Sequence, residues 1–228
     1  MKKLKALRIP LLVIFLVLFI DQFVKIWVKT HLYLGEEIPV FGNWFIINFV
    51  ENYGMAFGMQ FGGESGKIIL TSFRIIAAGL ILWYLIKITL KGIPKGLQVA
   101  IALIFVGAVG NIVDSVFYGL IFSDSLFEIA RMFPAEGGYA GLFHGRVVDM
   151  LYFPLFSGDF PSWFPIWGGQ HFTFFQPVFN LADASITTGV CMILVFQKRY
   201  FPKKVTPDAL TETAENTVPP GDENKTAS

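Results

Sequence analysis

The sequence of 228 residues contains a single cysteine, Cys191, and only three histidines, His31, His144 and His171. One cysteine cannot form an internal disulfide. The histidines are far apart and have no cysteine beside them, so they lack the spacing of a metal site. We therefore expect neither a disulfide nor a metal, and we predict no other cofactor.

Charge is also scarce. Charged residues make up 15% of the chain and the net charge is +1, whereas nucleic-acid binding requires a dense basic patch, so we expect no nucleic-acid partner. What is abundant is apolar surface: 54% of the residues are hydrophobic, 16% are aromatic, and the mean hydropathy is positive. A typical soluble domain is far less apolar. The composition predicts an integral membrane protein.

Four stretches are long and apolar enough to cross a membrane as helices, at about 9–28, 67–87, 97–122 and 178–197. Each reaches the ~20 residues that span ~30 Å of hydrocarbon. The first follows a basic segment, as a signal peptide does, but its apolar region is too long and no cleavage site follows it. We expect an all-α membrane protein, a four-transmembrane-helix bundle with a β-rich or loop segment after the first helix and a long aromatic loop before the fourth.

These spans are predicted to form one polytopic domain over residues 1–204, followed by a polar, proline-containing, disordered tail over 205–228. Lysine and arginine gather at the N-terminus, between the second and third spans, and after the fourth. Because basic residues favour the cytoplasmic side, both termini are predicted to be cytoplasmic. The connections at about 29–66 and 123–176 then face outward.

Polar residues recur within the spans at helical spacing. Two asparagine–aspartate pairs are three residues apart and one aspartate–lysine pair is four apart, so the members of each pair share a helix face. An ionisable residue at bilayer depth is costly and indicates function. The pairs all fall near the outer end of their spans, and they are Asn111 with Asp114, Asn180 with Asp183, and Asp21 with Lys25. We expect a polar cluster between helices, with Gly107 and Gly110 allowing close helix approach.

Five sequence blocks contain most of these polar residues: DQFVK (21–25), ENYGMAFG (51–58), GAVGNIVD (107–114), GRVVDM (145–150) and FNLADASI (179–186). Together they resemble, in order, the blocks of bacterial lipoprotein signal peptidase, also called signal peptidase II, the aspartyl protease family A8. Any one block is weak evidence, but five in order are strong. The resemblance implies a multi-pass enzyme of the bacterial cytoplasmic (inner) membrane that acts as a monomer among membrane lipids. Its substrates are prolipoproteins bearing a diacylglyceryl-cysteine, which it cuts just before that cysteine.

The resemblance also assigns residues. It implies that Asp149 and Asp183 are catalytic, and that five polar residues support them: Asp21, Asn52, Asn111, Asp114 and Asn180. Lys25, Gly54 and Arg146 are further candidates for support or substrate binding. Two carboxylates in a partly desolvated site do not both ionise readily, so one keeps a proton and serves as general acid while the other serves as general base. Nothing in the spacing brings Asp149 near Asp183; their convergence follows from the resemblance alone.

Two departures from the family pattern stand out. Ser115 follows Asp114 where relatives usually carry arginine, and Arg146 is a candidate to pair with Asp114 instead. The link from 115 to 144 is much longer than in the family, and its start, at about 123–133, is predicted to be an amphipathic surface helix. A second outer segment, 151–176, is dense in phenylalanine and tryptophan, which typically anchor at the headgroup level.

Other interpretations of these features stay open at the level of sequence. Asp21 and Lys25 favour a structural ion pair over catalysis, and a plain turn explains Gly54 and Gly58 about as well as substrate binding does. A proton-coupled transporter or channel would also place carboxylates in spans, although transporters usually show repeated halves and sites near the midplane. A structural scaffold would have little reason to retain them.

Overall fold

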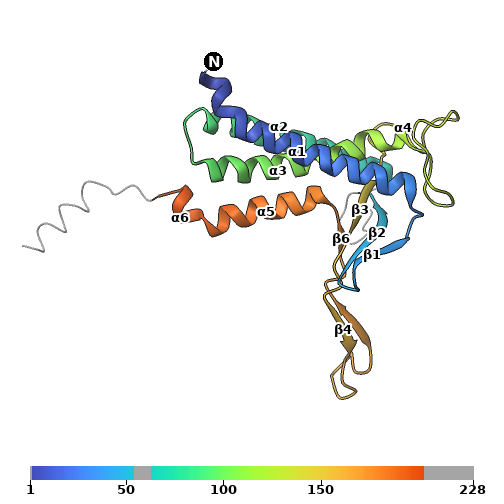
Figure 1. Cartoon of the computed structure of the whole chain (residues 1–228). Helices are drawn as coiled ribbons and strands as arrows, with labels where there is room; N and C mark the ends of the chain where they lie inside the picture. Colours follow the sequence, from blue (N-terminus) through green and yellow to red (C-terminus); the bar gives the residue numbers. More distant parts are fainter. Residues whose placement is uncertain (1, 54–62, 203–228) are drawn as a thin grey trace, which may run out of the picture.

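The computed structural model describes residues 2–53 and 63–202. Gly54 and the predicted tail over 205–228 lie outside this part of the chain. The described helices are α1 (Lys2–His31), α2 (Gly63–Thr89), α3 (Lys95–Val113), the π-helical turn η2 (Asp114–Tyr118), α4 (Gly119–Ile121), α5 (Leu181–Val195) and α6 (Gln197–Tyr200) (Figure 1).

Three of the predicted spans are helices long and apolar enough to cross a membrane: Lys5–His31, Ser65–Thr89 and Lys95–Ile121. The fourth is shorter than predicted. Residues 178 and 179 form a strand, and Asn180 caps the helix that follows, so α5 has only 15 residues. It falls below the length of the other three spans.

The expectation of an all-α protein is wrong, because the segments at one end of the bundle form two sheets. The larger one is antiparallel in the order β1 (Glu37–Phe41), β2 (Phe45–Asn52), β3 (Val147–Tyr152) and β6 (Val178–Phe179). The β-rich segment predicted after the first helix accounts for two of these strands. A separate hairpin pairs β4 (Phe156–Asp159) with β5 (His171–Phe174), within the predicted aromatic loop.

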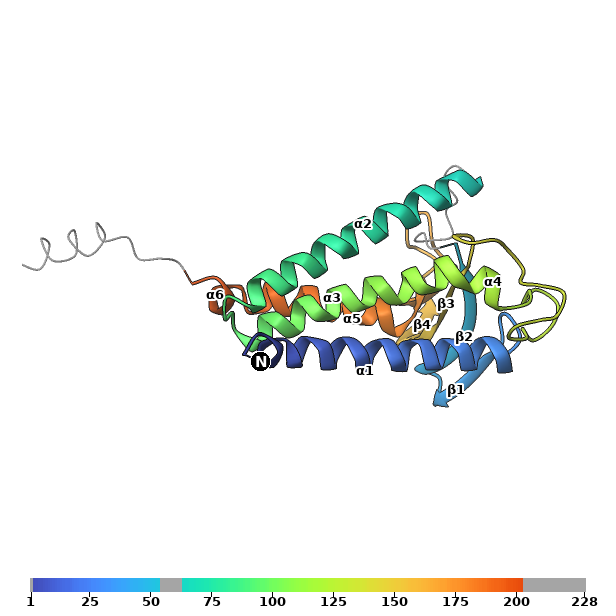
Figure 2. The same ribbon diagram turned by 90° about the horizontal axis from the view of Figure 1, so that it is seen from above.

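Helix α3 lies at the centre of the bundle, between α1 and α2 and against α5 (Figure 2). Gly107 and Gly110 permit this packing, as predicted. A Cβ atom on Gly107 would collide with the backbone of Ala182, and one on Gly110 would lie 2.7 Å from the Asp21 carboxylate. The N-terminus, the α2–α3 turn and α6 gather at one end of the bundle, and the sheets leave from the other (Figure 1).

Strand β3 is the link between the helices and the larger sheet. Its residues Val147–Met150 are all buried, and Val148 and Met150 pack into an apolar core with Val28 and Leu32 of α1. Successive side chains of a strand point to opposite faces. Asp149 therefore points away from that core.

The amphipathic helix predicted at about 123–133 does not form in residues 123–145. They run as an irregular segment fastened to the end of α4, through a bridge between Phe122 and Met132 and through backbone bonds from Tyr139 and Ala140 back to Phe122 and Gly119. Four glycines and a proline within 134–145 disfavour a helix in the second half of this segment. The segment extends beyond the bundle along the direction of the helices (Figures 1 and 2).

Candidate active site

Asp183 is positioned by the way α5 begins. Asn180 is the N-cap, and its Oδ1 accepts a bond from the Asp183 backbone amide at 2.9 Å. The Asp183 carboxylate in turn accepts a bond from the Asn180 amide, which completes a reciprocal capping box. The three-residue spacing of Asn180 and Asp183 is therefore the spacing that a capping box requires. It fixes the Asp183 carboxylate at the first turn of the helix, where the helix dipole favours negative charge.

Asp149 lies on β3, and its carboxylate contacts the same asparagine, Asn180. It lies opposite Val50 in the sheet and is 3% exposed. Its Oδ1 accepts a bond of 2.7 Å from the Asn180 side-chain amide, and its Oδ2 accepts one from the Asn52 side-chain amide at the end of β2. Asn180 thus contacts both predicted catalytic residues, one through its oxygen and the other through its nitrogen.

Asn111 of α3 makes a second bridge. Its Nδ2 donates to Asp183 Oδ1 at 2.8 Å, while its Oδ1 accepts from Lys25 Nζ and from Asn180 Nδ2, both at 3.0 Å. An ammonium group has only donors. Lys25 therefore fixes the orientation of the Asn111 amide, so that its NH₂ group faces the Asp183 carboxylate.

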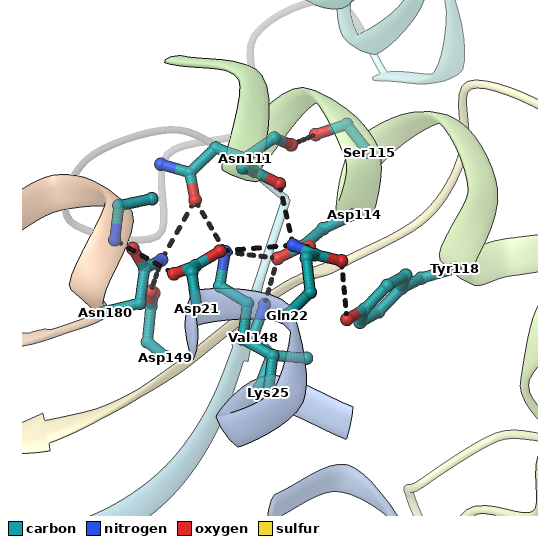
Figure 3. A network of polar contacts seen from close by, with 12 residues as sticks. Asp21, Gln22, Lys25, Asn111, Asp114, Ser115, Tyr118, Val148, Asp149 and Asn180 are labelled. Atoms are coloured by element: carbon teal, nitrogen blue, oxygen red, sulfur yellow. Dashed lines mark hydrogen bonds and ion pairs between the residues drawn. The ribbon is translucent and has the colours of Figure 1, made fainter. Parts of the chain in front are cut away.

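A buried ion network supports Lys25 (Figure 3). Its ammonium lies 3.1 Å from Asp21, the predicted i,i+4 partner, and 2.8 Å from Asp114, and all three side chains are at most 2% exposed. Gln22 donates to both carboxylates and accepts from Tyr118. Such a network tolerates burial because nearly every polar atom in it has a partner.

This network also holds the backbone on both sides of the aspartates. Asp21 Oδ1 accepts from the Ala182 amide at 2.9 Å, so α1 helps to cap α5. Asp114 Oδ2 accepts from the Val148 amide at 3.3 Å, next to Asp149 in the chain. Asp114 itself begins the π-helical turn η2, a geometry often found at functional sites.

The two aspartates differ in their electrostatic surroundings. Burial, reinforced by the negative charge of Asp183, raises the pKa of Asp149 to about 7. Hydrogen bonding from Asn180 and the charge of Lys25 act against this rise in pKa. Asp183 is only half-buried, and the guanidinium of Arg74 in α2 interacts favourably with its charge.

Arg146 does not pair with Asp114, because Lys25 occupies that carboxylate. Its guanidinium instead binds Asp124 through two nitrogens, at 2.9 and 3.1 Å, and Glu51 at 2.7 Å. The bonds from Arg146 hold the pKa of Asp124 below its usual range. Glu51 also forms an ion pair with the buried Lys29 of α1. Arg146 therefore fastens the irregular 123–145 segment to the sheet and to α1.

The sequence prediction missed Gln22, Lys29 and Glu51. A signal for Lys29 was present, since it follows Asp21 and Lys25 at four-residue intervals on one helix face. Gln22 and Glu51 lie inside the quoted blocks, but only the folded structure shows which carboxylate or cation each one meets.

Comparison with known proteins identifies the family. The family model described as signal peptidase (SPase) II matches residues 13–198. The chain belongs to the signal peptidase II family. The lipoprotein signal peptidase of Porphyromonas gingivalis is 48% identical over 210 residues, covering 90% of this chain and 91% of the relative. The lipoprotein signal peptidase of Amoebophilus asiaticus is 38% identical over 218 residues, covering 90% and 87%.

Solved structures agree at the level of the fold. Two structures of a bacterial membrane enzyme match with TM-scores of 0.55 and 0.53, at 24% and 25% identity, over 86% of this chain and over 93% and 94% of theirs. The chain is therefore a membrane peptidase of the signal peptidase II family. This membership favours the protease over the transporter and scaffold alternatives.

Proposed function

We propose that this enzyme removes signal peptides from prolipoproteins, cutting before a cysteine that carries diacylglycerol, and that Asp149 and Asp183 perform the chemistry. The observation that carries the assignment is that the side-chain amides of Asn180 and Asn111 link the two carboxylates. Asn111 donates to Asp183, Asn180 donates to Asp149, and the two asparagines bond each other. They link aspartates that are 34 residues apart, one in a strand and one in a helix.

The surroundings assign a role to each aspartate. Asp149 is the more buried, and its raised pKa favours the protonated form, so it donates a hydrogen bond to the scissile carbonyl oxygen. Asp183 lies at a helix N-terminus, accepts from Asn111 and interacts with Arg74, and we assign it the role of general base. It takes a proton from the attacking water.

The reaction then follows from these protonation states. The hydroxyl of the water bonds to the carbonyl carbon, and Asp183 holds the released proton. The tetrahedral intermediate collapses as the C–N bond breaks and that proton passes to the leaving nitrogen. Neither a metal nor a serine or cysteine nucleophile is required.

The same proposal includes the topology. α5 serves as a fourth span together with α6, residues 1–204 form one polytopic domain in the bacterial inner membrane, and both termini face the cytoplasm. The lysine and arginine clusters at the N-terminus, the α2–α3 turn and the α5–α6 end support this orientation. In this orientation the aspartates open toward the outer leaflet, where a lipid-modified substrate would lie. The enzyme acts as a monomer.

The test is cleavage of a diacylglyceryl-modified prolipoprotein by the purified enzyme in detergent, followed by gel shift and by mass spectrometry of the product. We expect wild type to release a product that begins with the lipidated cysteine. Asp149→Asn and Asp183→Asn should each lose cleavage while keeping the wild-type elution volume and a thermal midpoint no lower than that of wild type. Glu128→Gln, an exposed carboxylate in the 123–145 segment, is the matched control and should cleave normally.

Two outcomes would contradict the proposal. A folded Asp149→Asn or Asp183→Asn variant that still cleaves would remove that residue from the chemistry. Equal cleavage of the prolipoprotein without its diacylglyceryl group would refute the proposed substrate class.

A further inference from the structure

The β4–β5 hairpin is an aromatic arm that projects from the protein. We define the arm as residues 153–175, which contain nine aromatic residues and only two charged or titratable side chains, Asp159 and His171. Those two pair with each other at 2.8 Å across the hairpin. No lysine or arginine occurs anywhere between residues 147 and 197.

The apex of the arm is apolar and exposed. Trp163 is 77% exposed, Ile166 is 86% exposed and Trp167 is 50% exposed. Ile166 has a φ of +72°, a conformation that is rare for a β-branched residue. Strained backbone of this kind is retained where surrounding structure enforces it, often at functional positions. Here it places an isoleucine at the outermost turn.

The arm is internally ordered. Phe160 stacks on Phe164 and packs against Phe172, with ring centroids 5.1 and 4.6 Å apart, and Phe156 stacks on Phe174 at 4.7 Å. The Gly169 amide donates to the Phe160 carbonyl at 2.9 Å, which closes the turn. These contacts hold the exposed apex as a preformed wedge.

The direction and depth of the arm identify what surrounds it. The sheet and arm leave the bundle sideways, across the helix axes (Figure 1). They leave where α5 begins, and its 15 residues rise only ~22 Å, less than the ~30 Å thickness of a hydrocarbon core. The arm therefore lies at the level of the outer leaflet.

We infer that this arm is a lipid-binding element whose apex inserts among the lipids of the outer leaflet. Its partner is the apolar and interfacial region of the bilayer itself, because tryptophan prefers that region and the arm has no cation to attract anionic headgroups. The arm connects β3, which contains Asp149, to β6, which leads into Asn180. Anchoring it steadies the sheet that carries half of the candidate active site.

Site-directed spin labelling of the full chain tests this inference, and Cys191 is the single native cysteine to remove. In a Cys191→Ser background, nitroxides are attached at Trp163→Cys, at Trp83→Cys on the exposed face of α2, and at Phe127→Cys in the 123–145 segment. Phe127 is 95% exposed and lies on the segment that extends beyond the bundle, so it is the aqueous control. Collision with oxygen and with a water-soluble nickel chelate is measured in phosphatidylcholine nanodiscs.

The label at 163 is expected to behave like that at 83, with at least threefold greater oxygen collision relative to nickel than the label at 127. A label at 163 that matches the one at 127 would overturn the inference. Should Trp163→Cys elute as aggregate, Ile166→Cys replaces it. Added phosphatidylglycerol should change nothing, and insertion that requires this anionic lipid would contradict apolar binding. The spin-label measurement needs no substrate, so a negative result for lipid insertion is distinct from a negative result for the proposed cleavage.

Discussion

At the scale of single residues, Asn180 has two separable tasks. Its oxygen caps α5 and its amide nitrogen bonds Asp149. Asn180→Ser keeps a capping oxygen but loses the amide donor, whereas Asn180→Ala loses both. We expect both variants to lower kcat by up to about 10², because Asp149 loses a bond that orients it and a general acid contributes at least that much to the rate.

The thermal midpoint separates the two tasks. Only Asn180→Ala should also lose about 1 kcal/mol of stability from the missing cap. Equal cleavage by Asn180→Ser and wild type, measured on the lipidated substrate, would show that the bond to Asp149 has no catalytic part.

A second residue-scale prediction concerns pH. If Asp149 acts in its protonated form with a pKa of about 7, kcat/KM should decline as the pH rises through about 7, approaching tenfold for each further pH unit. A profile that stays flat from pH 6 to 9, measured with a substrate that does not titrate there, would refute that role.

The same raised pKa affects stability. Asp149 binds a proton in the folded state at pH values where the unfolded chain has lost it, so its contribution to stability falls between pH 4 and 7 and stays lost above pH 7. Asp149→Asn removes this titration. We expect its thermal midpoint to exceed that of wild type by a larger margin at pH 8 than at pH 5, as measured by scanning fluorimetry in detergent.

At the scale of elements, the contact between α3 and α5 decides where Asp183 lies. Gly107→Val would force a side chain into the backbone of Ala182, one residue before Asp183. Overpacking of this kind costs about 1–3 kcal/mol. We expect a lower thermal midpoint and reduced cleavage.

The matched control for this variant is Gly79→Val in α2, where an added Cβ meets nothing within 4 Å. It should behave as wild type. Equal loss of stability in both variants would mean that the effect reflects valine in a helix rather than helix contact.

Much of the element pattern could be predicted from composition, because long apolar runs have few alternatives in a membrane protein. Three spans and the Asn180–Asp183 spacing follow from local sequence. The position of Asp149 does not, since it depends on β3 pairing with β2, whose Asn52 is 97 residues away. The aromatic loop was predicted but its hairpin was not, because its aromatic residues do not alternate regularly with polar ones.

At the scale of the whole molecule, a second charge network joins parts that are distant in sequence. Glu51 of β2 lies between Lys29 of α1 and Arg146, and Arg146 also holds Asp124. Glu51→Gln leaves the buried Lys29 ammonium without its anion, which typically costs about 3–5 kcal/mol. Replacing Lys29 by Met in the same chain removes that unpaired charge.

We therefore expect Glu51→Gln to be less stable than the double variant Lys29→Met with Glu51→Gln. Glu51→Gln should also be cut faster than the double variant by limited proteolysis within 123–145, since Arg146 fastens that segment. The single variant Lys29→Met completes the comparison. If the stability losses of Glu51→Gln and Lys29→Met add up to that of the double variant, the pair is not energetically coupled.

The bond from the Ala182 amide to Asp21 joins positions 161 residues apart, because it links α1 to α5, which is synthesised much later. Asp183 and its capping asparagine leave the ribosome after every other part of the site. A nascent chain that has inserted only α1, α2 and α3 thus lacks one carboxylate and the helix end that orients it. Under the proposed catalytic assignment, the order of translation would leave the growing chain without peptidase activity until α5 has entered the membrane.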